Sequence, residues 1–256
     1  MEFQVDKLTA AFHDQDTLTA VVPLTGIDLG AVEEQWRVAA RAGADLVEWR
    51  LDYLEDDPDQ PSYRRETSEL AGELKEELGV PVLATYRSKA EGGYLDTEGP
   101  ALARYHNLVK DSAVWADAVD VELVRPGADE LIAELSQKLP VVASFHSHAG
   151  PFDPDFAKAI LREMGASGAT VAKLAWAAED KQQAAAIAEV QSWAALQLEV
   201  PSVVIGMGPE GILTRLGTPA LMSAFAFGTL GQESAPGQPT LVDLRSSVSK
   251  HSPLGD

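Results

Sequence analysis

The chain has 256 residues, of which 45% are hydrophobic and 23% charged, so it can bury a sizeable core in one large domain or two small ones. Its formal net charge of −20 argues against nucleic acid as the main partner, because binding phosphate requires clustered cations. Cysteine is absent, which excludes disulfides, thiol catalysis and cysteine-ligated metals.

The beginning of the chain carries no membrane-targeting pattern. Residues Met1 to Asp6 lack a basic region followed by an apolar segment. No apolar run approaches the roughly 20 residues of a membrane span. We therefore expect a cytoplasmic protein that binds neither membrane nor nucleic acid.

Short apolar runs rich in β-branched residues alternate along the chain with longer segments of helical period. Glycine or proline marks several of the junctions. The runs that predict strands are Leu18–Leu24, Ala44–Arg50, Val80–Arg87, Ala118–Val124, Pro140–His146, Ala169–Ala175, Val200–Gly206 and Ser223–Thr229. The segments that predict helices are 29–42, 64–78, 98–116, 128–138, 154–165, 179–198, 209–217 and 239–248.

This alternation predicts a closed parallel barrel with helices outside, the (β/α)8 TIM barrel, which is typically about 250 residues long. An open doubly wound sheet is the alternative. The first strand is followed by Pro23-Leu24-Thr25-Gly26 rather than by a glycine-rich phosphate loop, which disfavours a dinucleotide-binding sheet. No linker rich in Gly, Ser or Pro divides the chain. We expect a single domain over residues 1–256, with a short N-terminal segment before the first barrel strand.

Lys173 interrupts the apolar run Ala169–Ala175. Lysine is among the residues least often buried, so its place in a predicted strand has two interpretations. It is either a solvent-facing residue of an edge strand or a buried nucleophile. Burial favours a neutral amine, and a neutral amine attacks carbonyl groups.

Polar groups recur near the ends of five successive predicted strands. In a barrel of this kind the functional groups come from the C-terminal ends of strands and the loops after them. A structural ion pair, or a histidine that only completes a hydrogen bond, would explain any one of them by itself. Their repeated position favours an active site. These groups are Glu48, Arg50, Arg87, Asp120, Glu122, His146 and Lys173.

Several strings of sequence carry a resemblance to one enzyme family. They are Glu48-Trp49-Arg50-Leu51-Asp52, Thr85 to Gly93, Ser144-Phe145-His146, Ala172-Lys173-Leu174-Ala175, Gly206 to Gly217 and Ser234-Ala235-Pro236-Gly237-Gln238. In this order they resemble type I 3-dehydroquinate dehydratase over nearly the whole chain. The resemblance implies a (β/α)8 barrel that converts the small molecule 3-dehydroquinate to 3-dehydroshikimate and water. It also implies a shikimate-pathway role, in aromatic amino acid biosynthesis or quinate breakdown, and a homodimer that needs no metal or cofactor.

The resemblance assigns the chemistry to three residues. Lys173 would form a Schiff base with the substrate ketone, and the iminium would act as an electron sink. His146 would transfer protons, for which an unperturbed pKa of about 6.5 is suited. Glu91 would orient and polarise this histidine. An exposed loop charge is the other interpretation of Glu91, because Gly92 and Gly93 follow it.

The resemblance also implies a set of substrate contacts. Arg215 would bind the substrate carboxylate through two parallel donors. Arginines near Lys173 would favour its neutral amine. The loop from Ser234 to Gln238 would close over the substrate and exclude water. The residues implied to bind substrate are Glu48, Arg50, Arg87, Arg215, Ser234, Gln238, Met207, Phe227 and Ala235, with a core role equally open for Phe227.

Three positions depart from the family pattern. His148 stands in Ser147-His148, where the family commonly has Asp-Phe, and competes with His146 as a proton carrier. We favour His146, because His148 would lie beyond the strand. Pro23 stands where some relatives have a serine that contacts substrate, which puts that contact in doubt. Trp176 is bulkier than expected and is predicted to pack outside the barrel.

Two other function classes stay open. A class I aldolase also needs a buried lysine, although most such enzymes handle phosphorylated substrates. A non-catalytic sensor of quinate-like metabolites could use the same barrel, but Lys173, His146 and Glu91 are all present.

Overall fold

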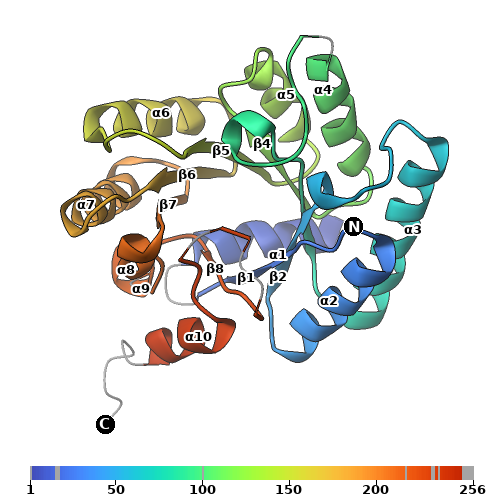
Figure 1. Cartoon of the computed structure of the whole chain (residues 1–256), viewed down its shortest axis with the longest axis horizontal. Coiled ribbons are helices and arrows are strands. Elements are labelled where there is room, and N and C mark those ends of the chain that lie inside the picture. The colour runs from blue at the N-terminus through green and yellow to red at the C-terminus, as the bar shows by residue number, and fades with distance from the viewer. Residues whose placement is uncertain are drawn as a thin grey trace.

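The computed structural model describes residues 2–14, 18–99, 101–216, 218–231, 234, 235 and 237–249. Its centre is an eight-stranded parallel sheet in the order β7-β6-β5-β4-β3-β2-β1-β8, curved into a nearly closed barrel (Figure 1). The expected (β/α)8 barrel is confirmed. The strands are β1 (Ala20–Leu24), β2 (Leu46–Arg50), β3 (Val82–Thr85), β4 (Ala118–Glu122), β5 (Val141–Ser147), β6 (Val171–Ala177), β7 (Ser202–Met207) and β8 (Ala226–Phe227).

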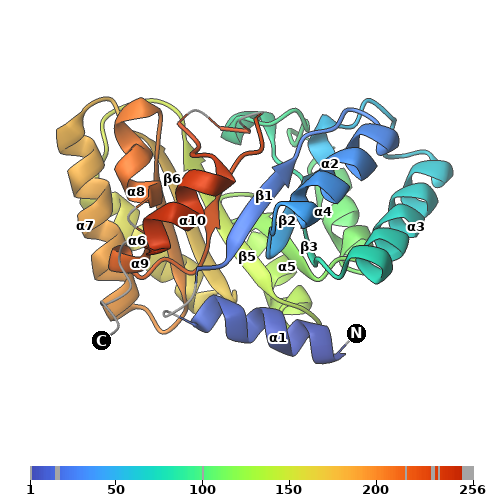
Figure 2. The ribbon, with the colours of Figure 1, turned by 90° about the horizontal axis from the view of Figure 1, so that it is seen from below.

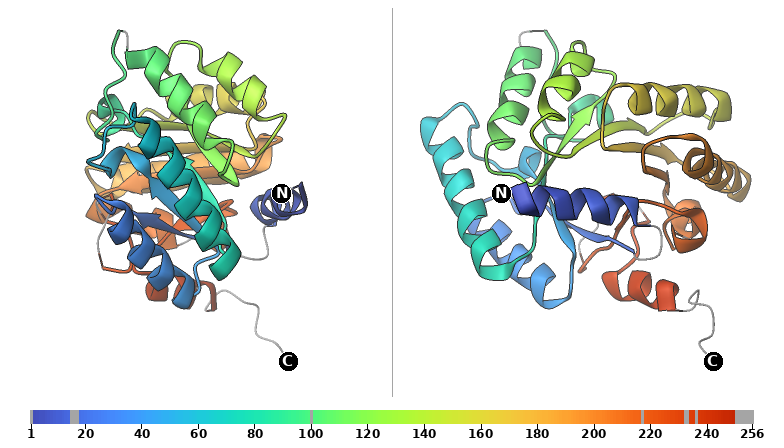
Figure 3. Two further views of the ribbon diagram at one scale, coloured as in Figure 1. Left: turned by 90° about the vertical axis from the view of Figure 1, so that its right-hand side faces the viewer. Right: turned by 180° about the vertical axis from the view of Figure 1, so that it is seen from behind.

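Helices cover the outside of the barrel (Figures 1 and 3). Three of these helices are capped at their N-termini by an aspartate whose side chain accepts backbone N–H groups of the first turn. The capping residues are Asp28, Asp153 and Asp180. The α-helices are α1 (Glu2–His13), α2 (Leu29–Arg41), α3 (Pro61–Leu78), α4 (Ala101–Ser112), α5 (Ala128–Leu135), α6 (Pro154–Ala166), α7 (Lys181–Gln197), α8 (Ile212–Leu216), α9 (Thr218–Leu221) and α10 (Leu241–Ser249). The 3-10 helices are η1 (Leu51–Tyr53), η2 (Lys89–Glu91) and η3 (Pro209–Gly211).

The interior of the barrel changes from apolar to polar along the strands. Every second strand residue points inward. The apolar inner layer consists of Val21, Leu46, Leu83, Ala118, Val142, Val171, Val203 and Phe225. Two residues further along β2 to β6 stand Glu48, Thr85, Asp120, Ser144 and Lys173, all buried. Polar chemistry is therefore confined to the carboxyl half of the barrel.

The short N-terminal segment expected before β1 is the helix α1, which crosses the amino-terminal end of the barrel (Figure 2). Leu8 and Phe12 pack into the apolar inner layer, and the Phe12 ring lies 5.4 Å from that of Phe225. The helix therefore closes the barrel at the end opposite the polar residues. Within the described part of the chain, no helix has the length and apolar character to cross a membrane.

The last strand is shorter than the expected run Ser223–Thr229. β8 pairs with β1 over Ala226 and Phe227 only. On its other side, the backbone N–H of Ala224 donates to the carbonyl of Ser202 at 2.9 Å, at the start of β7. The chain around β8 thus joins the first and seventh strands, which brings the ends of the sheet together.

Two expected helices also differ. The segment 98–116 is α-helical only from Ala101 to Ser112, whose hydroxyl turns back to the carbonyl of Val109 at 2.8 Å. The segment 209–217 begins with η3 and becomes α-helical in α8, because Gly208, with φ of 88°, and Pro209 enforce a sharp start. Helix α9 was not expected.

Candidate active site

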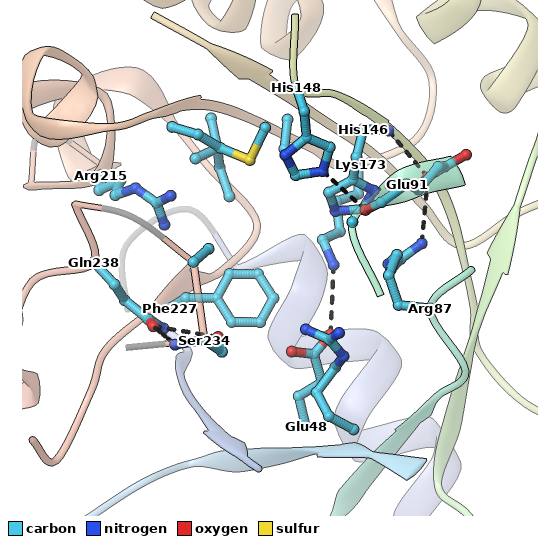
Figure 4. A pocket seen from close by; sticks show the side chains of 16 residues that line it. Glu48, Arg87, Glu91, His146, His148, Lys173, Arg215, Phe227, Ser234 and Gln238 are labelled. Carbon is cyan, nitrogen blue, oxygen red and sulfur yellow. Dashed lines mark hydrogen bonds and ion pairs between the residues drawn. The ribbon is translucent and has the colours of Figure 1, made fainter. Parts of the chain in front are cut away.

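The carboxyl ends of the strands surround a cavity (Figure 4). Every residue to which the family resemblance assigns a role lines it, together with Gly92, His148, Ala175 and Ile205. His146 and Glu91 lie on one side and Arg215 on the other, with Lys173 pointing between them. Among the described residues, no group of three or more acidic or histidine side chains is arranged to hold a metal ion.

Lys173 lies inside the barrel and not on an edge strand. Its strand pairs with β5 on one side and β7 on the other, and the residue is only 3% exposed. Nζ lies 4.8 Å from the centre of the Phe227 ring, which forms an apolar floor beside the amine. The solvent-facing interpretation of this lysine is therefore wrong.

The charged groups that contact Lys173 differ from the expected arginines. Nζ lies 3.3 Å from Oδ2 of Asp120 and 3.5 Å from Oε1 of Glu48. Glu48 also accepts a hydrogen bond from the hydroxyl of Thr85 at 3.1 Å. Because opposite charges attract strongly away from water, these carboxylates anchor the amine at the centre of the cavity.

His146 and Glu91 form a directly bonded pair. Oε2 of Glu91 accepts the backbone N–H of His146 at 3.0 Å and lies 2.9 Å from Nδ1 of its ring. Since Oε2 already acts as an acceptor, we assign the ring proton to Nδ1. This tautomer leaves the lone pair of Nε2 available as a base. Glu91 is buried in η2, so it is not an exposed loop charge.

Burial shifts the two pKa values of this pair in opposite directions. It raises the pKa of Glu91 to about 8, with the negative charge of Glu122 as the next cause. Burial lowers the pKa of His146 well below its usual value, with Arg87 and Lys173 adding to the effect. The imidazole is therefore neutral at neutral pH, and the carboxyl gains its charge only as the pH rises through about 8.

Arg87 is the centre of a buried ion network. Its Nη2 lies 2.8 Å from Asp120, and its Nη1 contacts Glu122 at 3.2 Å and Glu91 at 3.4 Å. Nη1 also donates to the hydroxyl of Ser144 at 2.9 Å, which donates in turn to Asp120 at 2.6 Å. The guanidinium thus links β3 to β4, β5 and η2.

The sequence analysis placed Asp120 and Glu122 among the polar groups at the strand ends, two residues apart, but assigned neither of them a contact or a chemical role. Asp120 contacts Lys173, Arg87 and Ser144. Glu122 accepts the backbone N–H of Ser88 at 2.7 Å and so fixes the start of η2. Their position on the same face of one strand was the sequence signal that could have predicted a role for both residues.

Asp52 is the third residue without an assigned role. It receives two hydrogen bonds of 2.8 Å from the guanidinium of Arg50 and also accepts the backbone N–H groups of Arg87 and Tyr94 at 3.2 Å. The Arg50 guanidinium lies over the ring of Tyr53 at 4.8 Å. Asp52 therefore orients Arg50 at the cavity.

Arg215 enters the cavity from α8, as expected. Its Nε donates to the carbonyl of Gly206 at 3.3 Å, and the hydroxyl of Thr214 accepts the N–H of Gly206 at 2.8 Å. Gly211 packs directly on the same peptide, since a Cβ there would lie 2.1 Å from the Gly206 carbonyl oxygen. These contacts fix the base of Arg215 against β7.

The loop that follows β8 brings Ser234, Ala235 and Gln238 to the cavity. Oε1 of Gln238 accepts the backbone N–H of Ser234 at 3.0 Å and lies 3.3 Å from its hydroxyl. Pro236 of this string lies outside the described residues. Met207, at the end of β7, is buried and supplies apolar wall.

Two of the departures from the family pattern lie outside the cavity lining. Pro23 lies in β1 beside Glu48 and lines a separate cavity next to α2. Trp176 packs on the outer face of β6 against Phe145 and Phe152, as expected. His148, in contrast, lines the active-site cavity.

Comparisons with known proteins agree with this arrangement. A profile of the type I 3-dehydroquinase family matches residues 20–251. The chain is 31% identical over 239 residues to the 3-dehydroquinate dehydratase of Methanothrix thermoacetophila, and this alignment covers 92% of this chain and 95% of the relative. It is 30% identical over 243 residues to the 3-dehydroquinate dehydratase of Klebsiella pneumoniae. This alignment covers 91% of this chain and 93% of the relative.

A solved structure shares the barrel. The crystal structure of 3-dehydroquinate dehydratase from Geobacillus kaustophilus matches 91% of each chain with a TM-score of 0.81 and 26% identity. The family match spans all of the strands and the cavity residues that they carry. The chain therefore belongs to the type I 3-dehydroquinase family and is an enzyme of the hydro-lyase class.

Proposed function

We propose that this cavity dehydrates 3-dehydroquinate to 3-dehydroshikimate through a Schiff base on Lys173. The observation that carries the proposal is a buried lysine amine that shares one cavity with the bonded His146–Glu91 pair. Ser144 pairs with Lys173 in the sheet, so His146 stands one inward position further toward the cavity mouth. This register supports a base beside the carbon next to an imine on Lys173.

The proposed reaction begins with Lys173, whose ammonium gives up one proton so that the free amine adds to the ketone carbon. That proton and one more from the nitrogen leave with the ketone oxygen as water, and a protonated imine remains. Nε2 of His146 takes a proton from the adjacent carbon, and the released electron pair forms an enamine. That pair then expels the neighbouring hydroxyl, which leaves as water with the proton returned by His146. Hydrolysis of the imine releases the product and restores Lys173.

The remaining side chains hold the substrate in this geometry. Arg215 supplies the cation for its carboxylate. Glu48 and Arg50 supply hydrogen-bonding groups for its hydroxyls and the ketone region. We place Ser234 and Gln238 over the bound ring, where their loop excludes water from the imine.

Borohydride reduction in the presence of 3-dehydroquinate tests the proposal. We expect a covalent adduct at Lys173, located by peptide mass spectrometry, and growing enone absorbance from the product. Lys173→Ala removes both signals, while the exposed control Lys181→Ala keeps them. If the wild-type enzyme yields no adduct, the Schiff-base mechanism is wrong. An adduct without enone absorbance would indicate a different imine-forming reaction, such as that of an aldolase.

We also propose a cytoplasmic homodimer with a shikimate-pathway role, supported by the sequence resemblance. The chain mass is 27.3 kDa, so sedimentation equilibrium that returns twice this mass would support the dimer.

A further inference from the structure

His148 makes a hydrogen bond that ties two loops together. It follows β5 directly, and its Nε2 lies 2.9 Å from the backbone carbonyl oxygen of Glu91. A carbonyl oxygen can only accept, so Nε2 of His148 carries the proton and donates. The bond holds the backbone of the residue whose carboxyl group orients His146.

The ring of His148 also packs directly against Gly92. A Cβ at Gly92 would lie 2.4 Å from Nε2 and 2.6 Å from Cε1 of the ring, and Gly92 has a φ of 84°. With no Cβ at Gly92, the imidazole comes close enough to bond the Glu91 carbonyl (Figure 4). The contact between the two loops therefore depends on both the His148 ring and the absence of a side chain at Gly92.

The loop that carries His148 is held from its other side. The indole Nε1 of Trp176 donates to the carbonyl of Gly150 at 3.2 Å. The Trp176 ring packs against those of Phe145, Phe152 and Phe156 at 5.5 to 6.1 Å. Trp176 thus anchors the chain two residues beyond His148 to the outer face of β6.

We propose that His148 is a positioning residue, which acts by holding the peptide of Glu91 so that its carboxyl stays on Nδ1 of His146. Trp176 supports it by anchoring its loop. This inference rests on the proposed function, because it assigns His148 to the proton-transfer step and not to imine formation. It joins two departures from the family pattern, His148 and Trp176, into one support for Glu91.

The donor is tested by two substitutions at one position. His148→Phe keeps a ring but has no donor, and we expect kcat to fall about tenfold while KM changes less than about twofold. His148→Gln places an amide nitrogen where Nε2 stands, and we expect it to retain kcat within about threefold of wild type. The borohydride adduct at Lys173 should form in both variants. The control is His106→Phe on α4, outside the cavity, with wild-type kinetics.

The loop anchor is tested by Trp176→Phe, which removes the donor to Gly150 and keeps an aromatic ring. We expect about a threefold lower kcat, and the double variant with His148→Phe should be no slower than His148→Phe alone, because Trp176 acts through His148. Circular dichroism shows whether His148→Phe folds. If it does not, Trp176→Phe and His148→Gln still test the proposal.

Four results would overturn the inference: unchanged kcat in His148→Phe, loss of the adduct in that variant, equal impairment of His148→Phe and His148→Gln, or multiplied effects in the double variant. The failure of the proposed function is a separate result, because it shows as a missing Lys173 adduct in the wild-type enzyme.

Discussion

At the residue scale, burial in the same part of the cavity shifts the pKa values of Glu91 and His146 in opposite directions. Burial disfavours the charged form of each, so it raises the pKa of Glu91 to about 8 and lowers that of His146 well below its usual value. In either protonation state Oε2 of Glu91 can accept from Nδ1 of His146. The carboxyl can thus orient the base without being charged.

The shift of Glu91 predicts a pH dependence of stability. Its folded pKa lies above the ordinary value of 4.5, so its stabilising contribution is complete below pH 4.5 and is lost as the pH rises through about 8. The lowered pKa of His146 acts in the opposite direction, but only below pH 6.5. Between pH 6.5 and 8, the wild-type free energy of unfolding should therefore fall by up to about 2 kcal/mol relative to Glu91→Gln.

Urea unfolding of both proteins at pH 6.5 and 8.0 measures this difference. Groups that do not contact residue 91 contribute equally to the two proteins, so they cancel in the comparison. Parallel pH profiles would show that Glu91 is ionised throughout this range.

At the element scale, the loop after β8 rests on the loop after β7. A Cβ at Gly237 would lie 2.3 Å from the carbonyl oxygen of Gly208, and the φ of Gly237 is 75°. Because the contact is with the backbone of Gly208, that residue cannot easily move to accommodate a side chain at position 237. The glycine in the string Ser234 to Gln238 is thus required by this close approach.

Gly237→Ala should displace the loop and lower kcat/KM at least about tenfold in steady-state assays, since Ser234 and Gln238 would leave the cavity. The matched control is Gly79→Ala at the end of α3, where φ is 68° and nothing lies within 4 Å of the added Cβ. The control should lose about 1 kcal/mol of stability and keep its activity. Equal kinetic effects in both variants would contradict this role of the loop.

At the scale of the whole molecule, the barrel separates stability from chemistry. Its amino-terminal end is apolar and closed by α1 (Figure 2), while the polar network lies at the carboxyl ends of the strands. Phe12 is 1% exposed and packs on Phe225. Phe12 does not line the cavity, although its partner Phe225 lies 5.5 Å from Phe227, so this helix stabilises the fold from outside the active site.

Phe12→Ala should therefore lower the free energy of unfolding by about 3 to 5 kcal/mol and leave kcat/KM of the folded enzyme unchanged. The control Val242→Ala, at a position that is 73% exposed, should change stability by less than about 0.5 kcal/mol. Denaturant unfolding and kinetics at 25 °C measure both. A fall in kcat/KM in the fully folded variant would show that the two ends of the barrel are coupled.

Most of the barrel was predictable from the sequence, because the period of apolar residues is local to each element. The expected strands all occur, and every residue to which the family resemblance assigns a role reaches the cavity. What failed was mostly at element ends: β8 is shorter and segment 209–217 is split. There, contacts with other parts of the chain decide the backbone conformation.

The sequence by itself determined that Lys173 stands in an apolar strand, that polar groups end its neighbours, and that the chain resembles one family. Only the tertiary structure decided which groups meet: Asp120 with Lys173, 53 residues apart, and His148 with the Glu91 carbonyl, 57 residues apart. Side-chain alternation specifies a direction within one strand, whereas a partner depends on strand register and loop path across the barrel. For that reason, the lysine was expected beside arginines and lies against carboxylates.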